Sequence, residues 1–244
     1  MNVKDKVVIV TGASSGIGLA TAKLLVKHGL RVALAARSRE KIWKLAKEFP
    51  RSFAVPTDMT NEIQIRKMVK DVLNHYGRID ILINNAGQGY DASIEEIDMD
   101  KFRKVFELDV VGPLVAMQAV IPVMQKQGKG VIVNISSGTS LMGLPNMSAY
   151  SSAKRALNGI TLTAREELKK DNIIVSVVYP YVTITDFEKN TIKNKSEEQN
   201  GEDFYEGLPH PPDNPEYIAE KILEGIKNGK AEIFAHDWMK NLPE

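Results

Sequence analysis

The chain opens with short, unbroken apolar stretches separated by longer amphipathic ones. The apolar stretches are rich in β-branched residues, so they predict strands that are buried on both faces of a sheet. In the first half they are KVVIVTG (6–12), RVALAAR (31–37), SFAVPTD (52–58) and IDILINNAG (79–87). The segments between them, residues 16–29, 38–49 and 60–77, have the apolar spacing of helices.

The second half continues this alternation. Residues 99–127, 149–170 and 215–229 predict helices, and GVIVNIS (130–136), IIVSVVYP (173–180) and AEIFAH (231–236) predict strands. Strands and helices that alternate at this pace predict a parallel sheet with helices on both faces. The expected fold is therefore α/β: a single doubly wound, Rossmann-like sheet of about seven strands in one domain, residues 1–244.

One segment breaks the pattern. Residues 183–215 are polar and end in a proline cluster, HPPDNP. Long irregular insertions in compact domains are usually lids, binding loops or disordered segments. Because this one follows a predicted strand on the side where ligands bind in such sheets, we expect a substrate lid, with disorder in the free protein left open.

Composition narrows the function classes. The 244 residues carry a net charge of +1 and no cysteine. The charge balance gives no electrostatic case for nucleic acid or an anionic membrane, and the missing cysteines exclude disulfides, thiolate zinc sites and thiol catalysis. No stretch is expected to span a membrane and no metal site is expected, since the four histidines are scattered. We expect a cytoplasmic protein.

TGASSGIG (11–18) links the first predicted strand to the first helix. Glycines let a backbone turn tightly and approach a ligand, and N–H groups at a helix start can hold a pyrophosphate. A turn that serves chain geometry alone is the alternative. The candidate cofactor-binding residues here are Gly12, Ser14, Ser15, Gly16, Ile17 and Gly18.

The end of the second strand indicates which nicotinamide cofactor to expect. NAD sites commonly place an acidic residue there for the ribose hydroxyls, but this chain has Ala36 and then Arg37. A guanidinium can bind a 2′-phosphate, so we expect NADP(H) in preference to NAD(H), with a solvated Arg37 as the alternative. Asp58 follows the third strand, where it could meet the adenine or begin the next helix.

The chain resembles the short-chain dehydrogenase/reductase family over nearly its whole length. TGASSGIG resembles the family's cofactor turn, NNAG (84–87) its fourth-strand motif, and YSSAK (150–154) its catalytic Tyr-x-x-x-Lys. Ser137 precedes Tyr150 by thirteen residues, the separation that the family commonly shows. A second such pair, Tyr217 and Lys221, has no serine partner and is interpreted as structural.

The resemblance implies roles for these residues. Tyr150 would exchange a proton with the substrate oxygen while hydride moves to or from its carbon, and Ser137 would hydrogen-bond that oxygen. An ordinary tyrosine titrates near ~10, so we expect the Lys154 cation, one helical turn away, to lower the pKa of Tyr150. The resemblance also implies that Lys154 binds the hydroxyl groups of the nicotinamide ribose.

The resemblance further places residues around the cofactor. Asn85, Ala86 and Gly87 would lie along the adenosine ribose, while Asn84 would brace the sheet. Beyond the sixth strand, the matching residues are Pro180, Thr183 and Thr185. Tyr181 stands where the family often has glycine, and it either tolerates the backbone geometry or narrows the substrate site.

A second departure lies in the long fourth helix. LDVVG places Asp109 where the family usually has an asparagine that helps to hold a water linking the lysine to solvent. Aspartate can still accept a hydrogen bond, but it brings a negative charge towards Lys154. We expect Asp109 to keep the proton relay and change its pH dependence. The alternative is a helix-bulge residue with no part in proton transfer.

Together these features predict an NADP(H)-dependent oxidoreductase that interconverts a carbonyl and an alcohol, with a ketone or aldehyde reductase as the expected activity. The alternative is a non-catalytic NADP(H)-binding sensor or scaffold on the same fold. The resemblance implies a homodimer or homotetramer. A small-molecule substrate would contact loops 88–95 and 138–147 and the 183–215 segment, and its identity is open.

Overall fold

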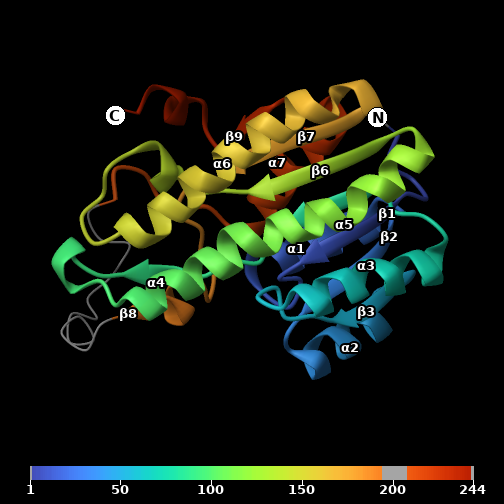
Figure 1. Ribbon diagram of the computed structural model, residues 1–244, viewed down its shortest axis with the longest axis horizontal. Helices are drawn as coiled ribbons and strands as arrows, with labels where there is room; N and C mark the ends of the chain where they lie inside the picture. Colours follow the sequence, from blue (N-terminus) through green and yellow to red (C-terminus); the bar gives the residue numbers. More distant parts are fainter. Residues whose placement is uncertain (1, 194–207, 243–244) are drawn as a thin grey trace.

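The computed structural model describes residues 2–193 and 208–242. Its centre is a seven-stranded parallel sheet with the strand order β3-β2-β1-β4-β6-β7-β9 (Figure 1). The strands are β1 (Val7–Thr11), β2 (Arg31–Ala36), β3 (Ser52–Pro56), β4 (Ile81–Asn84), β6 (Gly130–Ile135), β7 (Ile173–Tyr179) and β9 (Glu232–Phe234). The expected doubly wound α/β fold is confirmed.

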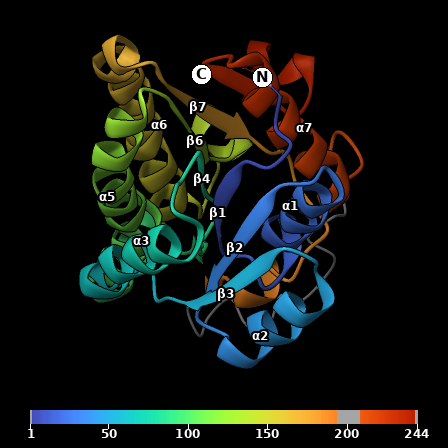
Figure 2. The same ribbon diagram turned by 90° about the vertical axis from the view of Figure 1, so that its right-hand side faces the viewer.

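Helices cover both faces of this sheet, as Figure 2 shows from the side. One layer contains α1 (Gly16–Lys27), α2 (Arg39–Glu48) and α7 (Pro215–Asn228). The other contains α3 (Glu62–Tyr76), α4 (Met99–Phe106), α5 (Gly112–Gln127) and α6 (Ser148–Leu168). Short 3₁₀ turns cover Ile94–Glu96, Gly138–Leu141, Lys169–Asp171, Glu188–Asn190 and Asp237–Asn241.

Burial on both faces explains the unbroken apolar strands. In β1, Val8 and Val10 face the core beneath α1 and α7, while Val7 and Ile9 face the core beneath α3 and α5. All four side chains are fully buried. Each such side chain contributes roughly 1.5–3 kcal/mol of transfer free energy, so the two cores together hold the sheet rigid beneath the loops at its edge.

The predicted long helix over residues 99–127 is interrupted by a π-helical segment, Glu107–Val111, between α4 and α5. By length and composition alone the 29-residue run Met99–Gln127, which contains an 18-residue window with a mean hydropathy of 1.5, would suffice to cross a membrane, which the sequence analysis did not expect. A core helix meets the same criterion, and 56% of this apolar window is buried inside the protein. The Gly112 position approaches the Met59 carbonyl so closely that a Cβ would lie 2.3 Å from it.

The described ends of the 183–215 segment pack onto the rest of the chain. Thr183 forms a parallel bridge with Asp213. A two-residue strand, β8 (Ile192–Lys193), pairs with β5 (Tyr90–Asp91). The segment therefore has more structure at its two ends than its polar sequence predicts. The part of the expected lid between residues 194 and 207 lies outside the described residues.

Asp80 joins the first and fourth strands at the amino-terminal edge of the sheet. Its carboxylate accepts hydrogen bonds from the Val7 N–H (2.9 Å) and from the guanidinium of Arg78 (2.6 and 2.8 Å). Burial of Asp80 opposes its charge, but these bonds outweigh burial and lower the pKa of the carboxyl below its usual value. The native state therefore holds the proton less tightly than the unfolded chain does.

We expect Asp80→Asn to lower the free energy of unfolding by about 1–3 kcal/mol at pH 7, because it removes charge-assisted hydrogen bonds. Since the native pKa lies below the unfolded one, this stability is present above about pH 4 and is lost as the pH falls through the native pKa. Urea unfolding at pH 7 and pH 3 measures both effects.

Asp71→Asn is the matched control, because among the described residues Asp71 pairs with the exposed Lys67 alone, on the surface of α3. It should change the unfolding free energy by less than about 0.5 kcal/mol. If Asp80→Asn is as stable as the wild type at pH 7, or if its loss of unfolding free energy is the same at pH 3 as at pH 7, the Asp80 carboxylate does not supply this pH-dependent stability.

Candidate active site

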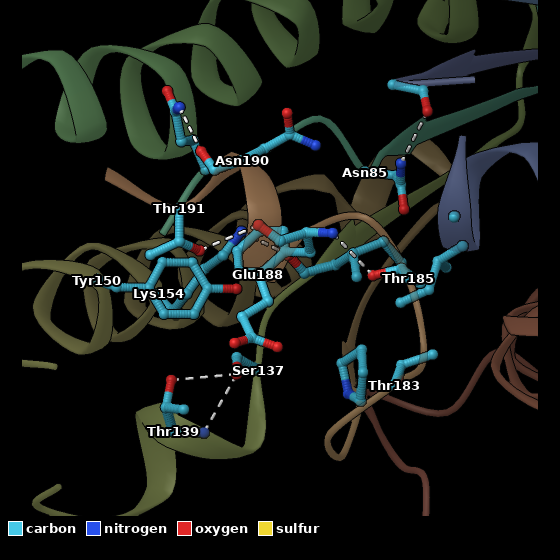
Figure 3. A pocket seen from close by; sticks show the side chains of 18 of the residues that line it. Asn85, Ser137, Thr139, Tyr150, Lys154, Thr183, Thr185, Glu188, Asn190 and Thr191 are labelled. Carbon is cyan, nitrogen blue, oxygen red and sulfur yellow. Dashed lines mark hydrogen bonds between the residues drawn. The ribbon is translucent and has the colours of Figure 1, made fainter. Parts of the chain in front are cut away.

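A cavity of about 740 Å³ opens at the carboxyl ends of the strands. Its lining includes residues that directly follow β1, β2, β4, β6 and β7, namely Gly12, Arg37, Asn85, Ser136 and Pro180. This edge is where doubly wound sheets bind ligands. The sheet topology therefore brings the candidate residues together from distant parts of the chain, and several of them appear in Figure 3.

Most of the predicted site residues line this cavity. They are Gly12, Ser14, Ser15, Gly16, Ile17, Arg37, Asn85, Ala86, Gly87, Ser137, Tyr150, Lys154, Pro180, Thr183 and Thr185. Three are not in the lining. Gly18 lies within the glycine turn, Asp109 lies beneath the cavity floor against Lys154, and Asp58 lies to one side.

The glycine turn has a backbone that only glycine accommodates at two points. Gly12 has φ +66°, and a Cβ on Gly18 would lie 2.3 Å from the Gly12 carbonyl oxygen. The turn leads into α1, whose N-cap residue Ser15 makes no side-chain hydrogen bond to the helix. Its N–H groups are thus available at the cavity, and the turn fits the pyrophosphate of a dinucleotide.

Asn85 holds the glycine turn in place. Its side chain donates to the carbonyl oxygen of Thr11 at 2.9 Å, and the Thr11 hydroxyl accepts from the N–H groups of Asn85 and Ala86. Asn84 braces the sheet, as expected, by donating to Asn134 of β6 at 2.8 Å. The two neighbouring asparagines therefore fix the cofactor turn and the strand beneath it.

Asp58 does not line the cavity, and its carboxylate is engaged in the turn before α3 (Glu62–Tyr76), whose N-cap residue is Asn61. Its carboxylate accepts hydrogen bonds from the N–H (2.9 Å) and the hydroxyl (2.8 Å) of Thr60, just before α3. These contacts favour the helix-start interpretation over a contact with adenine. The neighbouring residues Thr57 and Met59 do line the cavity.

Ser137, Tyr150 and Lys154 point into the same part of the cavity (Figure 3). Ser137 follows β6, and its Oγ accepts from the N–H of Thr139 at 3.2 Å. Tyr150 and Lys154 lie one turn apart near the start of α6, with the Lys154 Nζ 5.5 Å from the centre of the tyrosine ring. The Nζ donates to the Ile135 carbonyl oxygen at 3.0 Å, which holds the cation beneath the phenol.

Asp109 forms a buried ion pair with Lys154. The two side chains are 0% and 4% exposed, and the Asp109 Oδ2 lies 3.0 Å from the Lys154 Nζ. The other carboxylate oxygen accepts from the Gln88 N–H at 3.0 Å. A Cβ on Gly87 would lie 2.9 Å from Oδ2, so the pair needs a glycine there. The negative charge thus reaches Lys154, as the sequence indicated.

Burial and charge shift the pKa values of all three groups. Burial raises the pKa of the Tyr150 phenol; Lys154 and a hydrogen bond with Ser137 oppose this, while Asp109 adds to it. Lys154 does lower the pKa of Tyr150, as expected, but burial outweighs it, so the net pKa of the phenol in the free protein lies above its ordinary value. Burial disfavours the Lys154 ammonium, but Asp109 and Tyr150 outweigh it and raise its pKa. Burial also raises the pKa of Asp109.

The other Tyr-x-x-x-Lys pair has almost the same local geometry but a different setting. The Lys221 Nζ lies 5.4 Å from the ring centre of Tyr217, against 5.5 Å in the Tyr150 pair. The Tyr217 hydroxyl donates to the Ala235 carbonyl oxygen at 2.6 Å, and neither residue lines the cavity. The pair joins α7 to the chain after β9, so the structural interpretation is confirmed.

The sequence analysis missed part of the cavity wall. Trp238, Met239 and Leu242, from the carboxyl-terminal turn, line the cavity together with Phe187, whose ring lies 5.4 Å from that of Tyr150. The one signal for the turn was the apolar pair Trp238 and Met239, in the otherwise mixed run DWMKNL (237–242) beyond the last predicted strand. Nothing local in that run indicates that it packs against a loop a hundred positions earlier.

Comparison with known proteins identifies the family. A family model described as short chain dehydrogenase matches residues 6–196. An uncharacterised oxidoreductase of Staphylococcus aureus strain MW2 is 34% identical over 178 residues, 72% of this chain and 77% of that protein. An uncharacterised oxidoreductase of Bacillus subtilis strain 168 is 35% identical over 201 residues, which cover 81% of this chain and 78% of that protein.

Solved structures of similar proteins point to the same family. A short-chain dehydrogenase from Streptomyces avermitilis has a TM-score of 0.85 and 31% identity, covering 98% of this chain and 92% of that one. An NAD⁺-bound xylitol dehydrogenase has a TM-score of 0.72 and 34% identity, and the match covers 75% of this chain and 72% of that one. The chain belongs to the short-chain dehydrogenase family. It is an oxidoreductase of that family with a site for a nicotinamide cofactor.

We expect Asp109→Asn to move the pH–rate profile to lower pH. The neutral amide removes the negative charge that raises the pKa of Tyr150, while Lys154 still lowers it. In the direction of alcohol oxidation, which requires the phenolate, the rising limb of kcat/KM should then begin at a lower pH. In the direction of reduction, activity should fall at a lower pH. Rates measured from pH 5 to 10 with both proteins folded test this.

Asp100→Asn is the control, because Asp100 lies on the exposed first turn of α4 and pairs only with Arg103. Its profile should superimpose on that of the wild type. If the Asp109→Asn profile superimposes as well, Asp109 has no part in setting the proton affinity of Tyr150 and is only a residue of the helix bulge.

Proposed function

We propose that the protein transfers a hydride between NADP(H) and a carbonyl or alcohol substrate, acting as a ketone or aldehyde reductase. The observation that carries this is the convergence of Ser137, Tyr150 and Lys154 on a cavity that also contains the glycine turn. A bound nicotinamide supplies or accepts the hydride. The groups that hydrogen-bond the substrate oxygen and exchange its proton all come from this chain.

In reduction, the Ser137 hydroxyl donates a hydrogen bond to the carbonyl oxygen and orients it. Tyr150 gives its proton to that oxygen as negative charge develops there, which leaves a phenolate. Lys154, held by the Ile135 carbonyl and by Asp109, stabilises the phenolate. In the reverse direction the phenolate accepts the alcohol proton. A phenol with a raised pKa favours the protonated form that reduction requires.

The preference for NADP(H) is supported by the charges at the end of β2. Arg37 and Lys41 both line the cavity there, and the strand ends on Ala36 rather than on a carboxylate. Arg39 is engaged elsewhere, because its guanidinium stacks 4.3 Å from the ring centre of Trp43. We therefore assign the 2′-phosphate to Arg37 and Lys41. The similar xylitol dehydrogenase is NAD⁺-bound, so this strand end is where the two proteins would differ.

We further propose that residues 1–244 form one catalytic domain with its substrate lid in residues 183–215. Supporting this, Val182, Thr183, Thr185, Phe187 and Thr191 all line the cavity. A homodimer or homotetramer would use the helices on the α5 side, where Val111 is 38% exposed at the end of the π segment.

Tyr150→Phe should lower kcat for reduction of any carbonyl substrate by about a hundredfold or more, because it removes the proton donor and keeps the ring. NADPH oxidation over a panel of ketones and aldehydes measures this. Tyr217→Phe, in the structural pair, is the matched control and should keep its activity. Tight NADPH binding without turnover by the wild type on any carbonyl would favour the non-catalytic alternative.

Arg37→Ala should raise the Kd for NADPH about 10- to 100-fold, the equivalent of the roughly 1.5–3 kcal/mol of a hydrogen bond to a charged group. The Kd for NADH should stay the same, because NADH lacks the 2′-phosphate. Nicotinamide fluorescence titrations of both cofactors measure the change, with Arg39→Ala as the control. Equal losses for NADPH and NADH would contradict the assignment of the phosphate to Arg37.

A further inference from the structure

The carboxyl-terminal turn lies against Gly138, the residue that follows Ser137. Met239 is 1% exposed, and its methyl carbon lies 2.8 Å from where a Cβ on Gly138 would be. The Gly138 N–H donates to the Pro180 carbonyl at 2.8 Å, which joins the loop after β7 to the same point. Two segments that carry no proton-transfer group therefore border the place where a substrate carbonyl would meet Ser137.

Aromatic side chains form much of this border. Trp238 stacks on His210 with 4.3 Å between ring centres and meets Tyr181 edge-on at 5.1 Å. The ring of His236 lies parallel to the indole at 5.7 Å. Because these contacts hold the indole, its orientation is set before a ligand binds. Tyr181, at the family's usual glycine position, thus helps to shape the substrate side of the cavity.

We call the cavity-lining residues Tyr181, Trp238, Met239 and Leu242 the C-terminal wall. A hydrogen-bonded contact between His236 and Asp213 ties this wall to the loop that follows β7. His236 Nε2 lies 3.0 Å from both carboxylate oxygens of Asp213, and Asp213 pairs through its backbone with Val182 and Ile184. The wall is therefore a preformed surface, which is the condition for selecting a substrate by shape.

Charge on the described lining argues against an anionic substrate. The cations there are Arg37, Lys41 and Lys154. The first two follow β2, at the end assigned to the cofactor, and Lys154 is neutralised by Asp109. Glu188, from the loop after β7, lines the cavity as well (Figure 3). A substrate carboxylate or phosphate would meet this carboxylate without a free cation to balance it.

We propose, building on the reductase function above, that the substrate is an uncharged carbonyl compound with a ring-bearing apolar group. The ring packs on the C-terminal wall, and the carbonyl oxygen faces Ser137 and Tyr150. Ring-to-ring contacts and the burial of apolar surface supply the affinity. Glu188 supplies the discrimination against acids, because Arg37 and Lys41, the two cations other than Lys154 in the described lining, lie at the end of β2 that is assigned to the cofactor.

Two pairs of substrates test this through NADPH oxidation. Benzylacetone is butanone with an added phenyl ring. Levulinate has a carboxylate in the place of the terminal methyl group of methyl propyl ketone. The kcat/KM for benzylacetone should exceed that for butanone by a factor on the order of ten or more. Levulinate should be reduced at least tenfold less well than its neutral partner, on the same order as the cost of an unpaired charge in a binding site.

Trp238→Ala should remove most of the preference for benzylacetone, measured as the ratio of its kcat/KM to that for butanone, because the phenyl ring loses its contact with the indole. Leu242→Ala, near the chain end, should have the same effect to a smaller degree, and it serves if Trp238→Ala does not fold. Trp43→Ala is the control, because Trp43 is 46% exposed on α2 and lies outside the cavity. It should keep the full preference.

A binding measurement separates this inference from the reductase function. The chain has two tryptophans, so Trp43→Phe leaves Trp238 as the sole source of indole fluorescence. Benzylacetone should change that emission at lower concentration than butanone does, and levulinate should leave it unchanged, whether or not any turnover occurs.

Tyr150-dependent turnover without a preference for benzylacetone would overturn the inference and leave the reductase function standing. Equal reduction of levulinate and its neutral partner would overturn it as well. If no carbonyl is turned over, a Trp238 response to benzylacetone alone supports the wall as a binding surface, and no response refutes it.

Discussion

The buried ion pair between Lys154 and Asp109 is the constraint on which the active site depends. Moving two charges out of water is expensive, and leaving one of them unpaired in the interior costs about 3–5 kcal/mol. Each charge here is also satisfied by backbone, Lys154 by the Ile135 carbonyl and Asp109 by the Gln88 N–H. A pair held this completely fixes the position of the cation beneath Tyr150. It also fixes the net field at the phenol, because the two charges act on Tyr150 in opposite directions.

Several features of the fold follow from making room for that pair. Asp109 lies in the π-helical segment between α4 and α5, and such segments widen a helix and turn a side chain out of register. Gly87, in the loop that follows β4, leaves the space that the carboxylate and the ammonium occupy. The glycine turn is fixed separately, through Asn85 and Thr11. The sheet thus carries two independently braced groups of residues along one edge, the glycine turn proposed to bind the dinucleotide and the Lys154–Asp109 pair beside the proposed proton donor Tyr150.

Much of this could be predicted from the sequence, and the failures share a cause. The sheet followed from apolar strands buried on both faces, and the cavity lining followed from motifs at strand ends. The pKa of Tyr150 could not be predicted, because its direction depends on burial and on a long-range neighbour. Asp58 illustrates local competition, since its carboxylate is used by Thr60. Spacing alone was uninformative for Tyr217, whose lysine sits as close to its ring as Lys154 does to that of Tyr150. The two pairs differ in what surrounds them.

The catalytic groups and the proposed selective surface come from different parts of the chain. Ser137 and Tyr150 are positioned by β6, α6 and the ion pair, so a change there disturbs a network of buried charges. The C-terminal wall instead rests on ring stacking around Trp238 and on the pair formed by His236 and Asp213, both nearer the surface. Replacing a ring in that wall changes apolar contact area without leaving a buried charge unpaired. The architecture therefore allows substrate preference to change while the proton-transfer geometry stays the same, and Tyr181, which replaces the family's usual glycine, lies on the side that can vary.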